Sequence, residues 1–342
     1  MKRELKFVCI GAGFWSRYQL AGWNEVGDVQ CVAIANRTRA KAETVASSFG
    51  IQRVYDDPSE MIAAESPDFV DIVTDADTHA GYVELAAQYK VNVVCQKPMA
   101  PCLATARRMV KTCNAAGVRL LVNENWRWQA PIRALKNVLD SGAIGEVFRA
   151  RIEMISGFPV FRNQPFLKQL KQFILTDLGS HTLDTARFLF GEAASVYCQT
   201  NRVHSDIQGE DVASVLLRTQ SGATVIVQMA YAGNFLERER FPETFIFIEG
   251  RTGTLELAAD YWVRTTTAAG THARRYAPPR YAWADPAYDL VHASIVPCQL
   301  DLAADLRLQK VAETTGEDNL QTMELVFASY ESAESGQSVG LL

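Results

Sequence analysis

Hydrophobic runs and amphipathic helical patterns alternate along the first 125 residues of the chain. Short apolar runs predict strands, and apolar residues recurring every three or four positions predict helices. The predicted strands are residues 5–10, 29–35, 68–74, 91–96 and 118–125. The predicted helices are the segment from the turn at 11–16 to about residue 23, and residues 39–50, 78–90 and 103–117. This α/β alternation predicts a parallel, doubly wound sheet of the Rossmann type, whose ligands bind outside the carboxyl ends of the strands.

The pattern changes in the second part of the chain. Runs that read as half-buried strands, separated by turn signals, predict a mainly antiparallel sheet from residues 147–156, 194–204, 211–219, 223–231, 244–250 and 253–258. A strongly helical segment, residues 173–191, interrupts these strands. We therefore expect two domains, an α/β domain over residues 1–125 and an α+β domain over residues 126–342.

Composition narrows the class of protein. The chain has 342 residues, 48% of them hydrophobic and 21% charged, which suits two globular domains. A net charge of -5 without a basic stripe argues against a nucleic-acid partner, and no apolar run is long enough to span a membrane. The seven cysteines show no C-x-x-C spacing, no histidine pair has metal-site spacing, and the N-terminal apolar stretch is too short for a signal peptide. We expect a cytoplasmic protein with free thiols and no metal.

A glycine turn follows the first strand. In G-x-G-x-x-G, the first glycine makes the turn, the second lets the backbone approach a pyrophosphate and the third allows close helix packing. Gly11 and Gly13 fit this pattern, and Ser16 holds the third place. The helix N-terminus behind the turn favours an anion. The turn therefore predicts a dinucleotide site, with a plain strand-helix turn as the alternative.

The end of the second predicted strand bears on the cofactor. An acidic residue there would bind the ribose hydroxyls of NAD, whereas this chain has Asn36 followed by Arg37, with Lys41 nearby. Arginine can bind a 2'-phosphate, and asparagine does not repel one. The pattern leans slightly toward NADP, although Asn36 can equally bind a ribose hydroxyl and Arg37 can stack on adenine.

A lysine stands at the end of the fourth predicted strand. Pro98 keeps Lys97 in extended geometry, so its side chain leaves the strand in a restricted direction, and the Lys97–Pro98 bond is a candidate cis peptide. The alternative is a solvated lysine at a strand end.

Asp177 and His181 are the acid-base candidates of the helical segment. Their i, i+4 spacing places them on one helix face, and a carboxylate near a histidine can orient it as a general base. The alternatives are an ordinary surface pair, a helix cap with an unrelated histidine, and Asp184 as the partner of His181. Elsewhere, His79 follows a strand-end loop and can cap its helix.

Two further segments are candidates for ligand contact. Trp126 and Trp128 flank Arg127 at the domain crossover, where the tryptophans can seal the junction and the arginine can bind a ligand. The aromatic, proline-containing loop at 156–166 can line a sugar pocket or simply cover the core.

Several blocks in order, GAGFWS, DFVDIVTDADTH, QKP, NENWRWQ, DLGSH and GEDNLQTMELVFASYESA, resemble the Gfo/Idh/MocA family of nicotinamide-dependent sugar and polyol oxidoreductases over nearly the full length. The family usually has glutamate where Gln96 stands. The resemblance implies a dinucleotide-binding domain over residues 1–125, and an open-faced sheet domain over residues 126–342 that binds substrate and forms homo-dimers or homo-tetramers.

The resemblance also implies roles for individual residues. The implied catalytic residues are Lys97, Asp177 and His181. The implied cofactor contacts are Gly11, Gly13, Phe14, Trp15, Asn36, Arg37, Lys41, Thr74, His79, Gln96 and Lys97. The implied substrate contacts are Lys97, Arg127, Trp128, Phe158, Gln164, Asp177 and His181.

We therefore expect an NAD(P)-dependent dehydrogenase that oxidises a hydroxyl of a sugar or polyol. Segments such as CQKPMA, ENWRWQAPI and VFRNQPFL are most similar to a branch of the family that oxidises the branched pentose D-apiose to its lactone. That branch usually has an aspartate where Asn36 stands. The alternatives are a catalytically silent protein that senses a sugar or dinucleotide, and a glycoside-processing enzyme that oxidises its substrate transiently.

Overall fold

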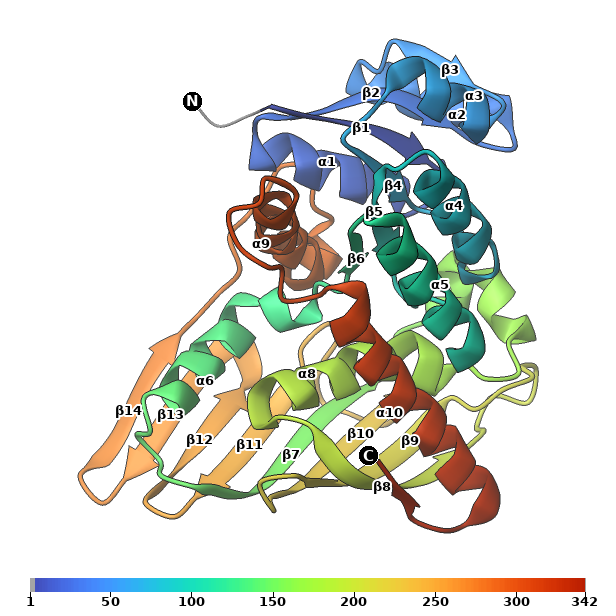
Figure 1. Cartoon of the computed structure of the whole chain (residues 1–342). Helices are drawn as coiled ribbons and strands as arrows, with labels where there is room; N and C mark the ends of the chain where they lie inside the picture. Colours follow the sequence, from blue (N-terminus) through green and yellow to red (C-terminus); the bar gives the residue numbers. More distant parts are fainter. Residues whose placement is uncertain (1–3, 342) are drawn as a thin grey trace. The chain divides into compact units, whose positions relative to one another are not determined.

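The computed structural model describes residues 4–341, so the outermost residues of both expected domains lie outside the described chain. Within it, contacts group the residues into two compact units. The first unit comprises the chain up to Asn125 together with Tyr281–Asp285 and Ile295–Met323. The second unit comprises Trp126–Arg280, Pro286–Ser294 and the chain from Glu324 onward. Each unit contains one sheet (Figure 1).

A six-stranded parallel sheet forms the first unit, in the order β3-β2-β1-β4-β5-β6. Its strands are β1 Leu5–Ile10, β2 Val29–Ala35, β3 Arg53–Tyr55, β4 Phe69–Ile72, β5 Asn92–Gln96 and β6 Leu120–Asn123. The accompanying helices are α1 Ser16–Val26, α2 Arg39–Phe49, α3 Pro58–Glu65, α4 Ala76–Gln88 and α5 Leu103–Ala116. The strand order reverses between β1 and β4, which confirms the predicted doubly wound fold and marks the ligand-binding edge.

Aromatic residues fill the core under this sheet. Phe7 of β1 stacks on Phe69 of β4 at 4.9 Å between ring centroids, and Trp23 of α1 packs at an angle against both rings. All three side chains are buried. The apolar runs that predicted the strands are therefore the same residues that form the core.

The sequence pattern predicted no element between residues 51 and 67, where the structure has β3 and α3. Strand β3 is only three residues long and none of them is fully buried, so it lacks a hydrophobic run. Helix α3 has a short apolar contact, through Met61 and Ile62, and its start is capped by Asp57, whose side chain accepts from the amide of Ser59. Short elements of this kind carry too little periodicity to be recognised.

A nine-stranded sheet forms the second unit, in the order β14-β13-β12-β11-β7-β10-β9-β8-β15. Its strands are β7 Val147–Ser156, β8 Ala193–Asn201, β9 Val212–Thr219, β10 Thr224–Tyr231, β11 Phe245–Gly250, β12 Gly253–Ala258, β13 Trp262–Thr267, β14 Gly270–Arg275 and β15 Val339–Gly340. Only β7 and β10 pair in parallel, which confirms a mainly antiparallel sheet. Strands β13, β14 and β15 were not predicted.

One face of this sheet is covered and the other is open. Helix α8 (Ser180–Phe190) packs on β7 and β10, and α6 (Ala130–Asp140) packs on β12 and β13 (Figure 1). Along β9, Val215 and Leu217 are buried while Leu216 between them is 43% exposed. This period of two is the pattern of a sheet with one solvated face.

Short helical segments complete the second unit, and two long helices contain residues of both units. The short segments are η1 Trp126–Trp128, α7 Val160–Asn163, η2 Pro165–Gln169, η3 Leu175–Gly179, η4 Ala259–Tyr261 and η5 Pro286–Tyr288. The long helices are α9 Asp289–Leu306 and α10 Gly316–Ser335. Segment η3 is a π-helical turn that leads directly into α8, so the helical segment predicted at 173–191 is not a uniform α-helix.

Candidate active site

The glycine turn lies at the carboxyl end of β1. Gly11 has φ +115°, and a Cβ there would lie 2.2 Å from the carbonyl oxygen of Val73, so only glycine fits. A Cβ on Gly13, in contrast, would meet nothing within 4 Å. The open space over Gly13 fits the close approach of a dinucleotide pyrophosphate, as the motif predicts.

Ser16 replaces the third glycine without disturbing this turn. Its side chain is fully buried, and its hydroxyl donates a 2.7 Å hydrogen bond to the carbonyl of Gly13. Phe14 is 42% exposed and Trp15 is half-buried, so both expected cofactor contacts remain accessible. Serine thus packs at the start of α1 and also ties the turn to the helix.

Asn36 is built into the turn. Its Oδ1 accepts from the amide of Ala12 at 3.1 Å, and its Nδ2 donates to the carbonyl of Thr38 at 3.0 Å. Arg37 and Lys41 are exposed beside it. The carboxamide of Asn36 therefore joins the glycine turn to the residues after β2. The exposed side chains of Arg37 and Lys41 take no part in these two hydrogen bonds and can bind a phosphate.

His79 does not offer its ring to a cofactor. It lies inside α4, is fully buried, and its ring nitrogens lie 3.0 Å from the carbonyl of Thr74 and 3.2 Å from that of Met99. Burial lowers the pKa of this imidazole. We expected His79 to contact the cofactor or to cap its helix. Its ring instead links the loop after β4 to the loop after β5. Thr74 itself is half-buried.

Lys97 follows β5 at the same edge of the sheet as the glycine turn. The Lys97–Pro98 peptide is cis, as proposed from the sequence, and the Lys97 side chain is half-buried. The amide of Lys97 donates to Oε1 of Gln96 at 3.2 Å. Gln96 is 7% exposed and turns inward, so its side chain serves the interior of the first unit.

Asp177 and His181 lie on consecutive helical segments of the second unit. Asp177 is half-buried in the π-turn η3, and its amide donates to the carbonyl of Phe173 at 2.8 Å. His181 is 6% exposed in the first turn of α8, and its ring stacks on Trp126 at 4.4 Å with an interplanar angle of 23°. A π-turn has more residues per turn than an α-helix, so the spacing of four does not align these residues as ideal helix geometry would.

A buried carboxylate anchors the segment before Asp177. Oε1 of Glu210 accepts from the amide of Phe173 at 3.1 Å and from the hydroxyl of Tyr330 at 2.6 Å. Burial raises the pKa of Glu210 and these hydrogen bonds oppose the rise. The backbone of Glu210 adds a further bond from the amide of Ile174. Residue 210 therefore fixes where η3 begins.

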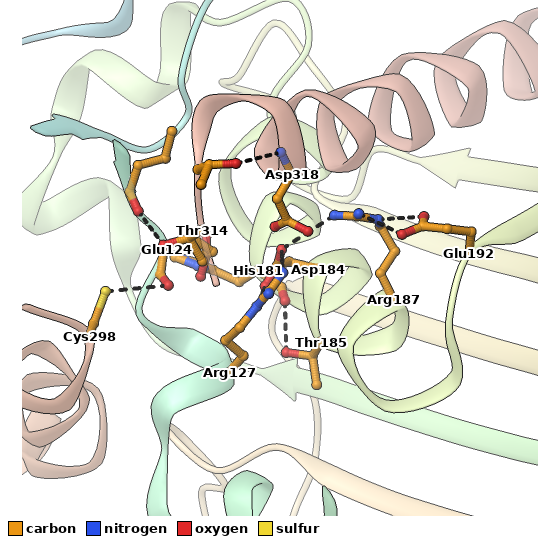
Figure 2. A network of polar contacts seen from close by, with 12 residues as sticks. Glu124, Arg127, His181, Asp184, Thr185, Arg187, Glu192, Cys298, Thr314 and Asp318 are labelled. Atoms are coloured by element: carbon orange, nitrogen blue, oxygen red, sulfur yellow. Dashed lines mark hydrogen bonds and ion pairs between the residues drawn. The ribbon is translucent and has the colours of Figure 1, made fainter. Parts of the chain in front are cut away.

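Arg127 is engaged inside the second unit rather than open to a ligand. It is 4% exposed, and its Nε and NH2 groups lie 2.7 Å and 2.5 Å from the two carboxylate oxygens of Asp184 (Figure 2). The same carboxylate lies 3.8 Å from NH1 of Arg187, which in turn pairs with Glu192 at 2.7 Å. The expected substrate contact is thus an internal ion pair that joins η1 to α8. Asp184, a candidate partner of His181, serves this pair.

An aromatic cluster surrounds the expected sugar loop. Phe158 stacks on Phe241 at 4.0 Å, and both rings meet Tyr288 edge-on at 5.3 Å and 5.2 Å. Trp128 is half-buried, with the guanidinium of Arg133 4.3 Å from its ring centroid. Gln164 is half-buried, and its amide donates to the carbonyl of Val160 at 3.0 Å.

Sequence reasoning did not identify Tyr288, Phe241 or the stacking of Trp126 on His181. The aromatic composition of NENWRWQ was the only signal for the last of these. Tyr288 and Phe241 come from distant segments, so only the fold brings them together.

The part of the chain that the structure describes, residues 4–341, shows no group of three or more histidine, cysteine or acidic residues that could hold a metal ion. Within the same residues, no helix combines the length and the apolar character needed to cross a membrane.

A doubly wound sheet with a glycine turn, followed in the chain by a mainly antiparallel sheet, is a fold found in NAD-binding oxidoreductases. The family comparison is specific: the profile for the oxidoreductase family with an NAD-binding Rossmann fold matches residues 5–124, and that for the GFO/IDH/MocA C-terminal domain matches residues 132–256. The chain belongs to the Gfo/Idh/MocA family and is an NAD(P)-dependent oxidoreductase acting on CH-OH groups.

Individual relatives match over almost the whole chain. D-apiose dehydrogenase of Paraburkholderia graminis is 44% identical over 339 residues, which is 99% of this chain and 90% of that protein. D-apiose dehydrogenase of Rhizobium rhizogenes is 43% identical over 338 residues, 99% of this chain and 98% of the relative. An oxidoreductase from Agrobacterium radiobacter, solved in complex with NAD+, L-tartaric acid and magnesium, superposes with a TM-score of 0.96 at 43% identity and 98% coverage of both chains.

Proposed function

We propose that this protein is a sugar dehydrogenase that oxidises D-apiose, or a closely related aldose, to its lactone. The observation that carries the proposal is the match to two D-apiose dehydrogenases at 44% and 43% identity across both domains. The chain also has a lysine at the end of β5 and a histidine in the first turn of α8. A catalytically silent sensor has no need for these groups, and the comparisons favour neither the sensor nor the glycoside-processing alternative.

The dinucleotide binds over the glycine turn in this proposal. Gly11 and Gly13 would hold the pyrophosphate, Phe14 and Trp15 would contact the cofactor, and Arg37 and Lys41 would bind its adenosine half. When bound, the nicotinamide ring accepts a hydride from the carbon that is oxidised. Because position 36 carries no carboxylate, we expect both NAD and NADP to bind, with a slight preference for NADP.

Lys97, His181 and Asp177 supply the proton chemistry. Lys97 holds the reacting hydroxyl and stabilises the negative charge that develops on its oxygen. His181 accepts the hydroxyl proton as the C–H bond breaks, so that oxidation of the C1 hemiacetal yields a lactone, with its hydride on the cofactor and its proton on the imidazole. Asp177 positions the sugar or the imidazole. Trp126, stacked on the His181 ring, holds that ring in one orientation.

The remaining contacts follow from the second unit. Trp128, Phe158 and Gln164 line the sugar site, where an aromatic face and an amide suit the apolar and polar sides of a pentose. Arg127 supports the site through Asp184 instead of binding the sugar. We keep residues 1–125 as the proposed dinucleotide domain and residues 126–342 as the proposed substrate domain, and within the latter Tyr281–Asp285 and Ile295–Met323 group with the first unit. The open sheet face, with Leu216, Tyr197 and Trp262 exposed, suits a homo-dimer or homo-tetramer, and seven free cysteines suit the cytoplasm.

Nicotinamide reduction by the purified protein tests the proposal. NAD and NADP are supplied in parallel with D-apiose, D-xylose, D-glucose and myo-inositol. We expect the highest kcat/KM with D-apiose. If the cofactor binds and every sugar is inert, the sensor alternative replaces the dehydrogenase. If a glycoside loses its aglycone without net reduction of the cofactor, the glycoside-processing alternative replaces it.

A further inference from the structure

A carboxylate is buried in the middle of the parallel sheet, away from the acid-base residues described above. Asp71 of β4 has no exposed surface. It accepts from Nε1 of Trp23 at 2.7 Å, and from Nε2 of Gln19 at 3.1 Å and 3.0 Å to its two oxygens. A buried charged group must be satisfied by donors, and the indole and the amide supply them.

This carboxylate determines which way the Gln19 amide faces. Above its pKa of about 7, Asp71 is ionised and only accepts hydrogen bonds, so the Nε2 end of Gln19 points toward it. Its Oε1 end then points toward the ends of β5 and β6. There it accepts from Nε2 of Gln96 at 3.0 Å and from Nδ2 of Asn123.

The direction passes on to Gln96. Because Nε2 of Gln96 is used to donate to Gln19, its Oε1 is left to accept, and it accepts from the backbone amide of Lys97 at 3.2 Å. Four groups are thus connected in one direction, from the carboxylate of Asp71 on β4 to the backbone amide of Lys97 at the edge of the sheet. Gln19, Asp71 and Gln96 are all at least nine-tenths buried, so water cannot replace a lost partner easily.

We propose that Asp71 and Gln19 are positioning residues for Lys97 and act through Gln96, an inference that rests on the catalytic role proposed for Lys97. It accounts for glutamine at position 96: a glutamate there could not donate to Gln19, whose Oε1 is held toward it by Asp71. A carboxylate oxygen of that glutamate and Oε1 of Gln19 would then face each other without a proton between them. Their repulsion would displace the side chain that accepts from the backbone amide of Lys97.

The proposal predicts that the direction of the whole connection can be reversed. In Asp71→Asn the side chain at 71 can donate, so Gln19 can turn around and direct Nε2 toward position 96. A glutamate at 96 then finds a donor. Asp71→Asn combined with Gln96→Glu keeps the net charge of the chain, because it moves one carboxylate from position 71 to position 96.

The experiment compares Gln96→Glu, Asp71→Asn and the double variant with the wild type. Steady-state kcat and KM for D-apiose are measured at pH 8, where Asp71 is ionised, together with hydrogen exchange of the peptide that contains Lys97. Exposed Gln52→Glu adds the same charge and serves as the control. We expect Gln96→Glu to lower kcat about tenfold or more with a smaller effect on KM, and to speed exchange at Lys97. In the double variant, kcat and the exchange rate at Lys97 should return to within about threefold of the wild-type values.

A double variant that folds like the wild type but is no better than Gln96→Glu in exchange and kcat overturns the proposal. If Gln96→Glu does not fold, Gln96→Met replaces it: this side chain neither donates nor accepts, so recovery of Gln96→Met by Asp71→Asn would equally overturn the directional connection. The exchange measurement needs no turnover. If exchange recovers in the double variant but Lys97→Met retains full activity, the positioning inference fails along with the role of Lys97, whereas inertness of the wild type toward every sugar rejects only the proposed function.

Discussion

Lys97 is the residue on which the proposed chemistry depends most. It is half-buried just after β5, where it follows the inward-facing Gln96 and precedes the cis-bonded Pro98. We predict that Lys97→Met lowers kcat by about a hundredfold or more, because the developing alkoxide loses its stabilising cation. Dinucleotide affinity, measured by fluorescence titration, should change little. Lys111→Met, on the exposed face of α5, is the control and should keep full activity.

Arg37 tests the cofactor assignment at the same scale. The side chain of Asn36 is hydrogen-bonded to the backbone of Ala12 and Thr38. The exposed guanidinium of Arg37 is therefore the better candidate to bind a 2'-phosphate. Arg37→Asp should raise KM for NADP about tenfold or more and leave KM for NAD within about twofold. Equal losses with both cofactors would show that Arg37 does not bind a phosphate.

Asp71 connects stability with pH. Burial raises its pKa to about 7, against the hydrogen bonds from Trp23 and Gln19 that lower it. Burial, with a smaller contribution from the charge of Asp71, also raises the pKa values of the Cys9 and Cys95 thiols well above normal, so these thiols stay neutral. Between about pH 4 and pH 7 the folded chain holds a proton here that the unfolded chain has released, so this group's contribution to folding stability falls as pH rises.

Asp71→Asn removes this dependence. From about pH 5 to pH 8 the free energy of unfolding should fall by roughly 3 kcal/mol less in the variant than in the wild type. Urea unfolding at the two pH values measures the difference, with the exposed Asp77→Asn as the control. Identical pH dependence in wild type and variant would mean that Asp71 is ionised throughout this range.

At the level of elements, the Arg127–Asp184 pair joins η1 to α8 and so places Trp126 against His181. Removing one member of a buried pair leaves the other charge uncompensated. Arg127→Met should therefore lower the free energy of unfolding by about 3 kcal/mol, at the lower end of such losses because Arg187 remains 3.8 Å from the carboxylate.

Arg251 offers a matched comparison. It pairs with Glu146 at 2.7 Å, but both side chains are more than half exposed. Arg251→Met should cost less than about 1 kcal/mol in the same urea experiment. If Arg127→Met instead left stability unchanged and raised KM for the sugar, Arg127 would be a substrate ligand, as the sequence alone suggested.

Elements with a clear hydrophobic period could be predicted, and those without one could not. Strands β7 and β9 were found nearly to the residue because their apolar positions alternate. Strand β14 escaped because all six of its residues are exposed, and at the edge of a sheet it needs no apolar face. The π-turn at η3 also left no trace in the pattern, since its apolar residues suit an α-helix equally well.

The site could be predicted where chemistry depends on residue type, and not where it depends on burial. Gly11 and Gly13 follow from the motif alone. His79 and Arg127 resembled ligand contacts in sequence, yet the fold closes over both, the first between two carbonyl groups and the second against Asp184. The role of Gln19 depends on partners 52 and 77 residues away, which no local pattern could show.

For the whole molecule, the proposed function assigns residues of both units to one reaction. In the proposed function, the first unit supplies the dinucleotide site and Lys97, and η3 and α8 of the second unit supply Asp177 and His181. The similarity to D-apiose dehydrogenases, at 44% and 43% identity, extends over both units. The proposed function therefore depends on one step, the transfer of hydride from C1 of the sugar to the nicotinamide.

The most direct measurement uses D-apiose carrying deuterium at C1. We expect that deuterium appears in the reduced nicotinamide, that a lactone forms in equal amount, and that kcat/KM for the labelled sugar is lower than for the unlabelled one. Retention of deuterium in the sugar product, or oxidation at another carbon, would contradict the proposed function.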